Sequence, residues 1–243
     1  MLSLSFDAAI SMRRRMVYNR RIGKDREDNM IDKMKETAGA HFRLTQQDIG
    51  SYADMKGKVS RFRTKVYDAE GAGRLCVMEM KAAAGLVRME TGVFSPTELD
   101  GPIFSFDYIK AGKNETLFLE LYDTTLSHPA FADLAAVAGR YADLPDCDPG
   151  EHWYDSLKLP VSRYKKGRKI GREAAAMMAD NTETYFHLLT ECQDCDPEEK
   201  KACNKAFADG LLSNGGPAVN TFREMMGDER TETFVREYMF CCR

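Results

Sequence analysis

Short segments in which apolar residues alternate with polar ones, or form brief runs, occupy the middle of the chain. They span residues 59–66, 74–81, 85–94, 103–109 and 116–123, and glycine, proline, aspartate or asparagine residues separate them. Such segments are typical of β-strands, and the gaps between them are too short for a helical crossover. The pattern therefore predicts an antiparallel meander over residues 57–126 and argues against a Rossmann-type sheet.

Helical patterns flank this meander on both sides. Before it, apolar residues recur at roughly helical spacing over residues 4–38. After it, the sequence predicts helices over residues 129–141, 171–190, 197–212, 218–226 and 229–240, with Asp196 as an N-cap. We therefore expect an α+β fold, a three-layer α/β/α sandwich whose central antiparallel sheet is flanked by helices. A single domain over residues 1–243 is expected, with its C-terminal helices spread over residues 129–240.

Composition and charge narrow the functional classes. Hydrophobic residues make up 43% of the 243 residues, and the formal net charge is −3. This balance argues against a dedicated nucleic-acid binder, and no segment approaches the ~18 consecutive apolar residues of a membrane helix. Seven cysteines, an odd number, fit reduced thiols. We expect a cytoplasmic protein with neither nucleic acid nor membrane among its partners.

A basic cluster lies near the N-terminus. It contains Arg13, Arg14, Arg15, Arg20, Arg21, Lys24 and Arg26. Two interpretations stay open, a solvated helix face and a docking patch for an acidic partner.

Carboxylates inside strands are the most informative chemical feature. Glu79 shares a strand face with Leu75 and Val77, and Asp107 shares one with Ile103 and Ser105. Glu90 lies in a third strand. A buried carboxyl group without a partner has a raised pKa and keeps its proton near neutrality, which makes it a natural proton donor. The alternative is that each acid lies at a sheet edge or pairs with a nearby arginine or lysine.

Other catalytic signatures are missing from the sequence. The segment 71–73 lacks the third glycine of a dinucleotide-binding loop, and neither a phosphate-binding Gly-Lys-Ser/Thr nor a Gly-x-Ser-x-Gly motif occurs. The four histidines are not spaced as metal ligands, and Cys192, Cys195 and Cys203 lack a second Cys-x-x-Cys pair. We therefore expect no metal site.

The strand acids occur in an order that resembles the ferredoxin-dependent bilin reductases. Glu79, Glu90 and Phe94 are followed by the segment 101–107, Gly-Pro-Ile-Phe-Ser-Phe-Asp. The segments 222–227 and 234–240 are similar to the closing helices of that family. The resemblance also extends to the related red chlorophyll catabolite reductase.

The resemblance implies a function. It implies an open-chain tetrapyrrole such as biliverdin, held between the sheet and the C-terminal helices and reduced in one-electron steps. No cofactor would be bound, because reduced ferredoxin, or flavodoxin, would supply the electrons. Asp107, Glu79 and Glu90 would supply protons. Phe94 and Asn214 would contact the substrate, and Arg163, Lys165 and Lys166 would meet its propionates or an acidic ferredoxin.

The chain departs from the family pattern in two places. Glu90 stands where the phycocyanobilin-forming enzyme has a histidine, and a Glu90 beside Asp107 would make a pair of carboxyl groups that cannot both ionise cheaply. Residues 213–217 lack the family's lysine, so the basic stretch 163–169 becomes the candidate for the propionates, or an ordinary solvated loop. Two alternatives follow: a tetrapyrrole-binding protein without catalysis, or a reductase of a chlorophyll catabolite.

Overall fold

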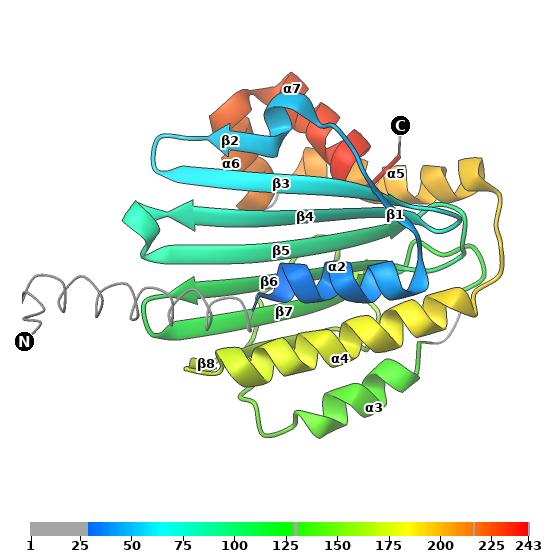
Figure 1. Ribbon diagram of the computed structural model, residues 1–243, viewed down its shortest axis with the longest axis horizontal. Helices are drawn as coiled ribbons and strands as arrows, with labels where there is room; N and C mark the ends of the chain where they lie inside the picture. The colour runs from blue at the N-terminus through cyan, green and yellow to red at the C-terminus, as the bar shows by residue number, and fades with distance from the viewer. Residues whose placement is uncertain (1–28, 129–130, 216, 243) are drawn as a thin grey trace, which may run out of the picture.

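The computed structural model describes residues 29–128, 131–215 and 217–242. Within them, one sheet contains eight strands: β1 (Leu44–Gln46), β2 (Asp54–Lys56), β3 (Ser60–Ala69), β4 (Gly73–Ala82), β5 (Val87–Pro96), β6 (Ile103–Ala111), β7 (Asn114–Tyr122) and β8 (Arg163–Arg168). The strand order is β1-β3-β4-β5-β6-β7-β8, β2 also pairs with β3, and every pairing is antiparallel. The predicted meander is confirmed, and it corresponds to β3–β7 (Figure 1).

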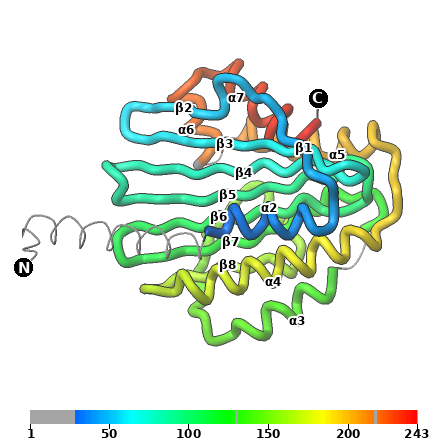
Figure 2. The backbone as a smooth tube through the Cα atoms, in the orientation of Figure 1, coloured from blue at the N-terminus to red at the C-terminus, as the bar shows by residue number. Residues whose placement is uncertain are grey.

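Helices cover both faces of the sheet (Figures 1 and 2). One layer contains α2 (Met30–His41), α3 (Asp133–Arg140) and α4 (Gly171–Thr190). The other contains α5 (Pro197–Asn214), α6 (Pro217–Met226), α7 (Asp228–Thr233) and the π-helical turn η4 (Phe234–Met239). We call the two sheet surfaces the α4 face and the C-terminal face. The predicted α/β/α sandwich is confirmed.

Alternation along the strands divides the core into two parts. On β4, Leu75 and Val77 pack on the α4 face, whereas Cys76 and Met78 pack on the C-terminal face. Because successive strand residues point to opposite sides, each central strand supplies apolar side chains to both layers. Because both faces of these strands are buried, their sequences contain nearly continuous apolar runs.

Gly92 allows α2 to lie close to the sheet. A Cβ atom at this position of β5 would collide with the side chains of Met34 on α2 and Phe106 on β6. Both side chains are fully buried. The absence of a side chain at residue 92 therefore sets how closely the helix approaches the strands.

Several helices begin or end at residues other than those predicted from the sequence. Residues 4–28 of the predicted N-terminal helix, including the basic cluster, lie outside the described residues, and α2 continues to His41. The helix predicted over residues 129–141 corresponds to the shorter α3. The helix predicted over residues 229–240 corresponds to two elements, α7 and η4. Asp196 caps α5 as predicted, accepting hydrogen bonds from the backbone N–H groups of Glu198 and Glu199. Three short helical turns, η1 (Gly50–Ala53), η2 (Ala83–Gly85) and η3 (Asp155–Leu157), complete the fold.

No helix among the described residues has both the length and the apolar character needed to cross a bilayer.

Candidate functional site

Asp107 lies on β6 with its side chain on the C-terminal face. The register places Thr91 of β5 and Phe118 of β7 directly beside it. The Thr91 hydroxyl donates a hydrogen bond to the Asp107 carboxyl group. Burial raises the pKa of Asp107 to about 6, although the Thr91 hydrogen bond acts in the opposite direction. A carboxyl group with this pKa can give up and recover a proton near neutral pH.

A second carboxylate, Glu120, lies on the same face one strand away. It is 9% exposed and accepts hydrogen bonds from the hydroxyl groups of Tyr122, at 2.5 Å, and Tyr164, at 3.1 Å. Lys158 Nζ is 3.0 Å from Glu120 Oε1. The charge of Glu120 contributes to the raised pKa of Asp107. Glu120 is therefore a hydrogen-bonded anion held beside a protonatable acid.

Lys158 joins this buried cluster to the surface. Its ammonium group also lies 3.0 Å from Asp155 Oδ1 and about equally far above the rings of Tyr154 and Tyr164, at 4.9 and 5.0 Å from their centroids. Burial lowers the pKa of Lys158, but hydrogen bonds with Tyr164, Asp155 and Glu120 more than offset it and leave that pKa above its ordinary value. Lys158 is thus a permanent cation that balances Glu120.

Apolar side chains surround Asp107 on the C-terminal face. Val93, Met78 and Ile103 are buried under the C-terminal helices. Toward the other end of the strands, side chains on this face are only half-buried: Met80, Met89, Ile109 and Phe118. Neighbouring strands lie ~4.8 Å apart, so these four side chains on β4–β7 form a shelf about 14 Å wide. Asp107 lies where the covered part of the face meets this shelf.

Glu79 and Glu90 lie on the α4 face. They are directly opposite each other on β4 and β5. Glu90 Oε2 accepts hydrogen bonds from the backbone N–H groups of Met30, at 2.8 Å, and Ile31, at 3.4 Å, at the start of α2. Burial raises the pKa of Glu90, and the charge of Glu79 adds to the effect. Glu79 itself forms an ion pair with Lys81 at 2.8 Å.

The expectation that Glu90 lies beside Asp107 is wrong. Thr91, and not Glu90, is the cross-strand neighbour of Asp107, and Glu90 is opposite Tyr108. A step of one residue along a strand moves the side chain to the other face, so the sheet separates Glu90 and Glu79 from Asp107. The structure brings together Glu79 with Glu90, and Asp107 with Thr91 and Glu120.

The contacts of Phe94 and Asn214 lie elsewhere in the protein than the Asp107 carboxyl group. Phe94 is fully buried on the α4 face, where its ring packs edge-on against Phe186 with centroids 4.9 Å apart. Asn214 is exposed at the end of α5, and its side-chain amide donates to the carbonyl of Gly210 in the same helix at 3.0 Å. The substrate contacts of these two residues stay predictions.

The basic stretch 163–169 is mostly an edge strand, so its side chains point to both faces. Lys165 faces α4, is 4% exposed, donates to the carbonyl of Leu144 at 2.9 Å and pairs with Asp146 at 2.7 Å. Arg163 binds two backbone carbonyls of the preceding loop. Lys166 is exposed and lies on the C-terminal face. Of these three residues, only Lys166 shares the face of Asp107.

Sequence reasoning missed the Glu120 cluster. The segment 117–122, Leu-Phe-Leu-Glu-Leu-Tyr, places Glu120 on one face with Phe118 and Tyr122, which is the same signal that identified Asp107. No sequence pattern predicts the contribution of Lys158, because this residue reaches Glu120 from a loop far along the chain. The described residues contain no group of three or more histidine, cysteine, aspartate or glutamate side chains placed to hold a metal ion.

Comparisons with known proteins find a likeness among solved structures. No protein-family model and no curated protein sequence matches the chain. Among solved structures, phytochromobilin synthase from tomato, in complex with biliverdin, is similar with a TM-score of 0.66 and 13% sequence identity. The alignment covers 86% of this chain and 80% of that chain. This chain therefore has the fold of a biliverdin-binding phytochromobilin synthase.

Proposed function

We propose that this protein is a ferredoxin-dependent reductase of biliverdin or a closely related linear tetrapyrrole. The observation that carries the proposal is the position of Asp107, a carboxyl group with a pKa of about 6 beside a half-buried apolar shelf. A flat conjugated pigment fits such a surface, since its rings need apolar contact and its nitrogen or carbonyl groups need a proton donor. The shared fold with a biliverdin complex supports this ligand class.

In the proposed reaction, two electrons and two protons saturate one double bond of the pigment. Ferredoxin gives the electrons singly, and each added electron makes the pigment more basic. After the first electron, Asp107 transfers its proton to the pigment and takes up another from water, and it transfers this second proton after the second electron. The Glu120 anion favours the protonated form of Asp107 beforehand, and Lys158 keeps the charge of Glu120 balanced. Lys166 is the candidate for a propionate, because it is exposed on this face.

Anaerobic turnover tests the proposal. Purified protein is mixed with biliverdin, its absorption spectrum is recorded, and reduced ferredoxin is then added without oxygen. We expect a reshaped absorption band on mixing and a further loss or shift of that band on reduction, with a reduced bilin on product chromatography. Unchanged spectra at both stages would contradict the proposed ligand class.

The alternative is a bilin-binding protein without catalysis. One observation favours it: the cross-strand neighbours of Asp107 are Thr91 and Phe118, neither of which is an acid. In that case biliverdin changes the spectrum on mixing, and reduced ferredoxin adds nothing. The same experiment therefore separates the two functions.

A further inference from the structure

Three hairpin turns form one end of the sheet. They join β2 to β3 (residues 57–59), β4 to β5 (83–86) and β6 to β7 (112–113), and lie on the left in Figure 1. The backbone N–H of Ala83 donates to the Val59 carbonyl at 3.2 Å, and that of Gly112 donates to the Leu86 carbonyl at 3.3 Å. These bonds hold the turns together as one surface.

The turns carry the most exposed large apolar side chains of the described residues. Val59 is 76% exposed and Leu86 is 72% exposed, compared with 39% for Leu126 at the opposite end of the sheet. Ala83 and Ala84, which precede Leu86, both have left-handed backbone angles, with φ of 48° and 54°. Such conformations are unfavourable for alanine and persist where the surrounding structure imposes them. The turn is thus held in a shape that presents Leu86 to the outside.

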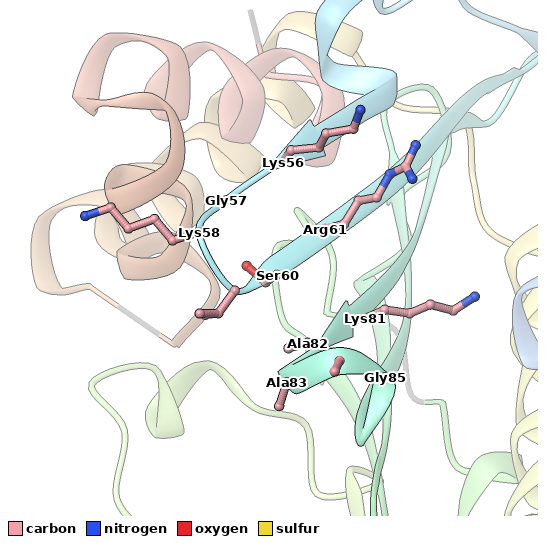
Figure 3. A pocket seen from close by; sticks show the side chains of 11 residues that line it. Lys56, Gly57, Lys58, Ser60, Arg61, Lys81, Ala82, Ala83 and Gly85 are labelled. Atoms are coloured by element: carbon pink, nitrogen blue, oxygen red, sulfur yellow. The ribbon is translucent and has the colours of Figure 1, made fainter.

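Cations surround these two side chains. A hollow of about 550 Å³ between the first two turns is lined by Lys56, Lys58, Arg61 and Lys81, together with Ser60 (Figure 3). In Figure 3, Lys56, Arg61 and Lys81 extend to the same side, and Lys58 extends to the other.

The neighbouring strand ends and the β6–β7 turn add Arg88, Lys110 and Lys113. Arg61, Lys81 and Lys110 have carboxylate partners, in Asp54, Glu79 and Glu115. Among the described residues this end therefore has seven basic side chains, and three of them form ion pairs there.

We propose that this end of the sheet binds the surface of an anionic lipid bilayer, with Val59 and Leu86 inserted among the headgroups and the lysines on their phosphates. Two observations favour a bilayer over an acidic protein. The apolar side chains lie on protruding turns. A surface that binds a protein partner is instead a closely packed patch that is complementary in shape to the partner. The cations here that lack an ion-pair partner among the described residues are mainly lysines, and their mobile point charges suit mobile phosphates. The proposal departs from the sequence expectation of no membrane partner. That expectation rested on the lack of a spanning helix, and binding at the bilayer surface needs no such helix.

Co-sedimentation with lipid vesicles tests this binding. The full chain is mixed with vesicles of phosphatidylcholine alone or with added phosphatidylglycerol. We expect binding only to the anionic vesicles, with weakening as salt rises. Each lysine near such a surface contributes roughly fivefold to partitioning, so Lys56→Gln with Lys58→Gln should reduce binding by about twenty-five-fold. Lys201→Gln with Lys205→Gln, an equal charge change on α5, is the matched control and should leave binding unchanged.

A second set of variants tests how much the apolar side chains contribute to vesicle binding. Val59→Asn with Leu86→Asn should weaken vesicle binding by roughly tenfold or more, and Leu126→Asn should not. In a Leu86→Trp variant, brominated lipids should quench the fluorescence of the added tryptophan, whereas the fluorescence of a Leu126→Trp variant should not be quenched. The natural Trp153 is common to both variants. Equal binding to both vesicle types, or no quenching at position 86, would overturn the proposal. Binding to a soluble acidic protein without binding to vesicles would also overturn it and identify a protein interface.

Discussion

Asp107 and Glu120 are carboxyl groups on neighbouring strands with different hydrogen-bond partners. Asp107 has the Thr91 hydroxyl as its hydrogen-bond donor, and burial raises its pKa to about 6. Glu120 has an ion pair with Lys158 and hydrogen bonds from two tyrosine hydroxyl groups. A buried acid with a raised pKa beside a second carboxyl group is typical of proton-transfer sites.

The first prediction concerns the proton donor itself. Asp107→Asn keeps the shape of the side chain and removes its acid, so biliverdin binding should change by only a few-fold while turnover falls by about a hundredfold or more. Binding titrations and anaerobic turnover measure the two quantities. Glu79→Gln is the matched control, since it makes the same change on the opposite face and should leave turnover nearly unchanged. Full turnover in Asp107→Asn would remove this residue from the mechanism.

The raised pKa of Asp107 also predicts a pH dependence of stability. Below the ordinary aspartate pKa, both the folded and the unfolded chain hold the proton. Between about pH 4 and pH 6 only the folded chain holds it, so the free energy of unfolding decreases as pH rises through this window. Relative to the wild type, Asp107→Asn should therefore gain about 1–2 kcal/mol between pH 4 and pH 7, as measured by urea unfolding. Parallel pH curves for the two proteins would contradict this linkage.

Glu120 and Lys158 should move the titration of Asp107 in opposite directions. Glu120→Gln removes a negative charge near Asp107 and should lower its pKa, whereas Lys158→Met leaves Glu120 without its cation and should raise it. Carbon NMR of the aspartate side chains, assigned by the signal missing in Asp107→Asn, measures shifts of up to about one pH unit. Shifts in the same direction would show that Asp107 responds to something other than this ion pair.

At the scale of elements, a strand carboxylate fixes the start of a helix. Asn29 caps α2 by accepting a hydrogen bond from the Asp32 backbone N–H, and Glu90 accepts from the backbone N–H groups of Met30 and Ile31. Free N–H groups and the helix dipole both favour a negative charge at this end. Glu90 therefore acts in the structure as a tertiary cap that attaches α2 to β5.

Loss of this cap should weaken the attachment. Glu90→Ala should reduce the free energy of unfolding by about 1–2 kcal/mol, and Glu90→Gln, which keeps an acceptor oxygen, should cost less. Urea unfolding measures both variants. Glu79→Ala removes only a half-exposed ion pair and should cost less than about 0.5 kcal/mol. An equal cost for Glu79→Ala and Glu90→Ala would show that the helix N-terminus is not the cause.

At the scale of the whole molecule, a fully buried lysine connects the C-terminal layer to the sheet. Lys200 on α5 donates hydrogen bonds from Nζ to the carbonyl of Gly101, at 2.6 Å, and to that of Thr124, at 2.5 Å. Asp100 Oδ1 lies 4.0 Å away. Burial lowers the pKa of Lys200, and the charge of Asp100 acts against this effect. One side chain thus ties α5 to the loops at one end of the meander.

Replacement of this lysine should affect the stability of the entire fold. Lys200→Met leaves buried carbonyl groups and the Asp100 charge without their partner, so we expect the free energy of unfolding to fall by about 3 kcal/mol. Lys201→Met, one residue along the same helix, is the control and should be nearly neutral. A single cooperative urea transition with a lower midpoint is the expected measurement. A neutral Lys200→Met would mean that the methionine restores through packing what the hydrogen bonds supply.

The sequence was sufficient for the central sheet and for the face of Asp107. Strands β3–β7 alternate or run apolar over long segments, and that pattern depends only on local periodicity. The short strands β1 and β2 were not predicted, because three residues carry too little pattern. Strand β8 was also missed, since its lysines and arginines at a sheet edge resemble a solvated loop.

The sequence did not predict which residues lie beside each of the strand acids. Order along the chain placed Glu90 near Asp107, but the hairpin register decides which residues face each other, and it selects Thr91. The Lys158–Glu120 pair joins segments that have α3 between them in the chain, and local patterning contains no information about such contacts. The chemistry of Asp107 was therefore predictable from one strand, and its neighbours were not.

The sheet that separates Glu90 from Asp107 also makes two properties of this protein independently adjustable. Even-numbered β5 positions such as Glu90 and Gly92 determine how α2 is seated, whereas the adjacent odd-numbered Thr91 meets the candidate proton donor. A protein engineer could therefore vary residues 78, 91 and 118 to change selectivity for the proposed pigment, and vary residues 77, 90 and 92 to change thermal stability. Libraries built on alternate codons of the same strands would explore the two traits with little interference between them.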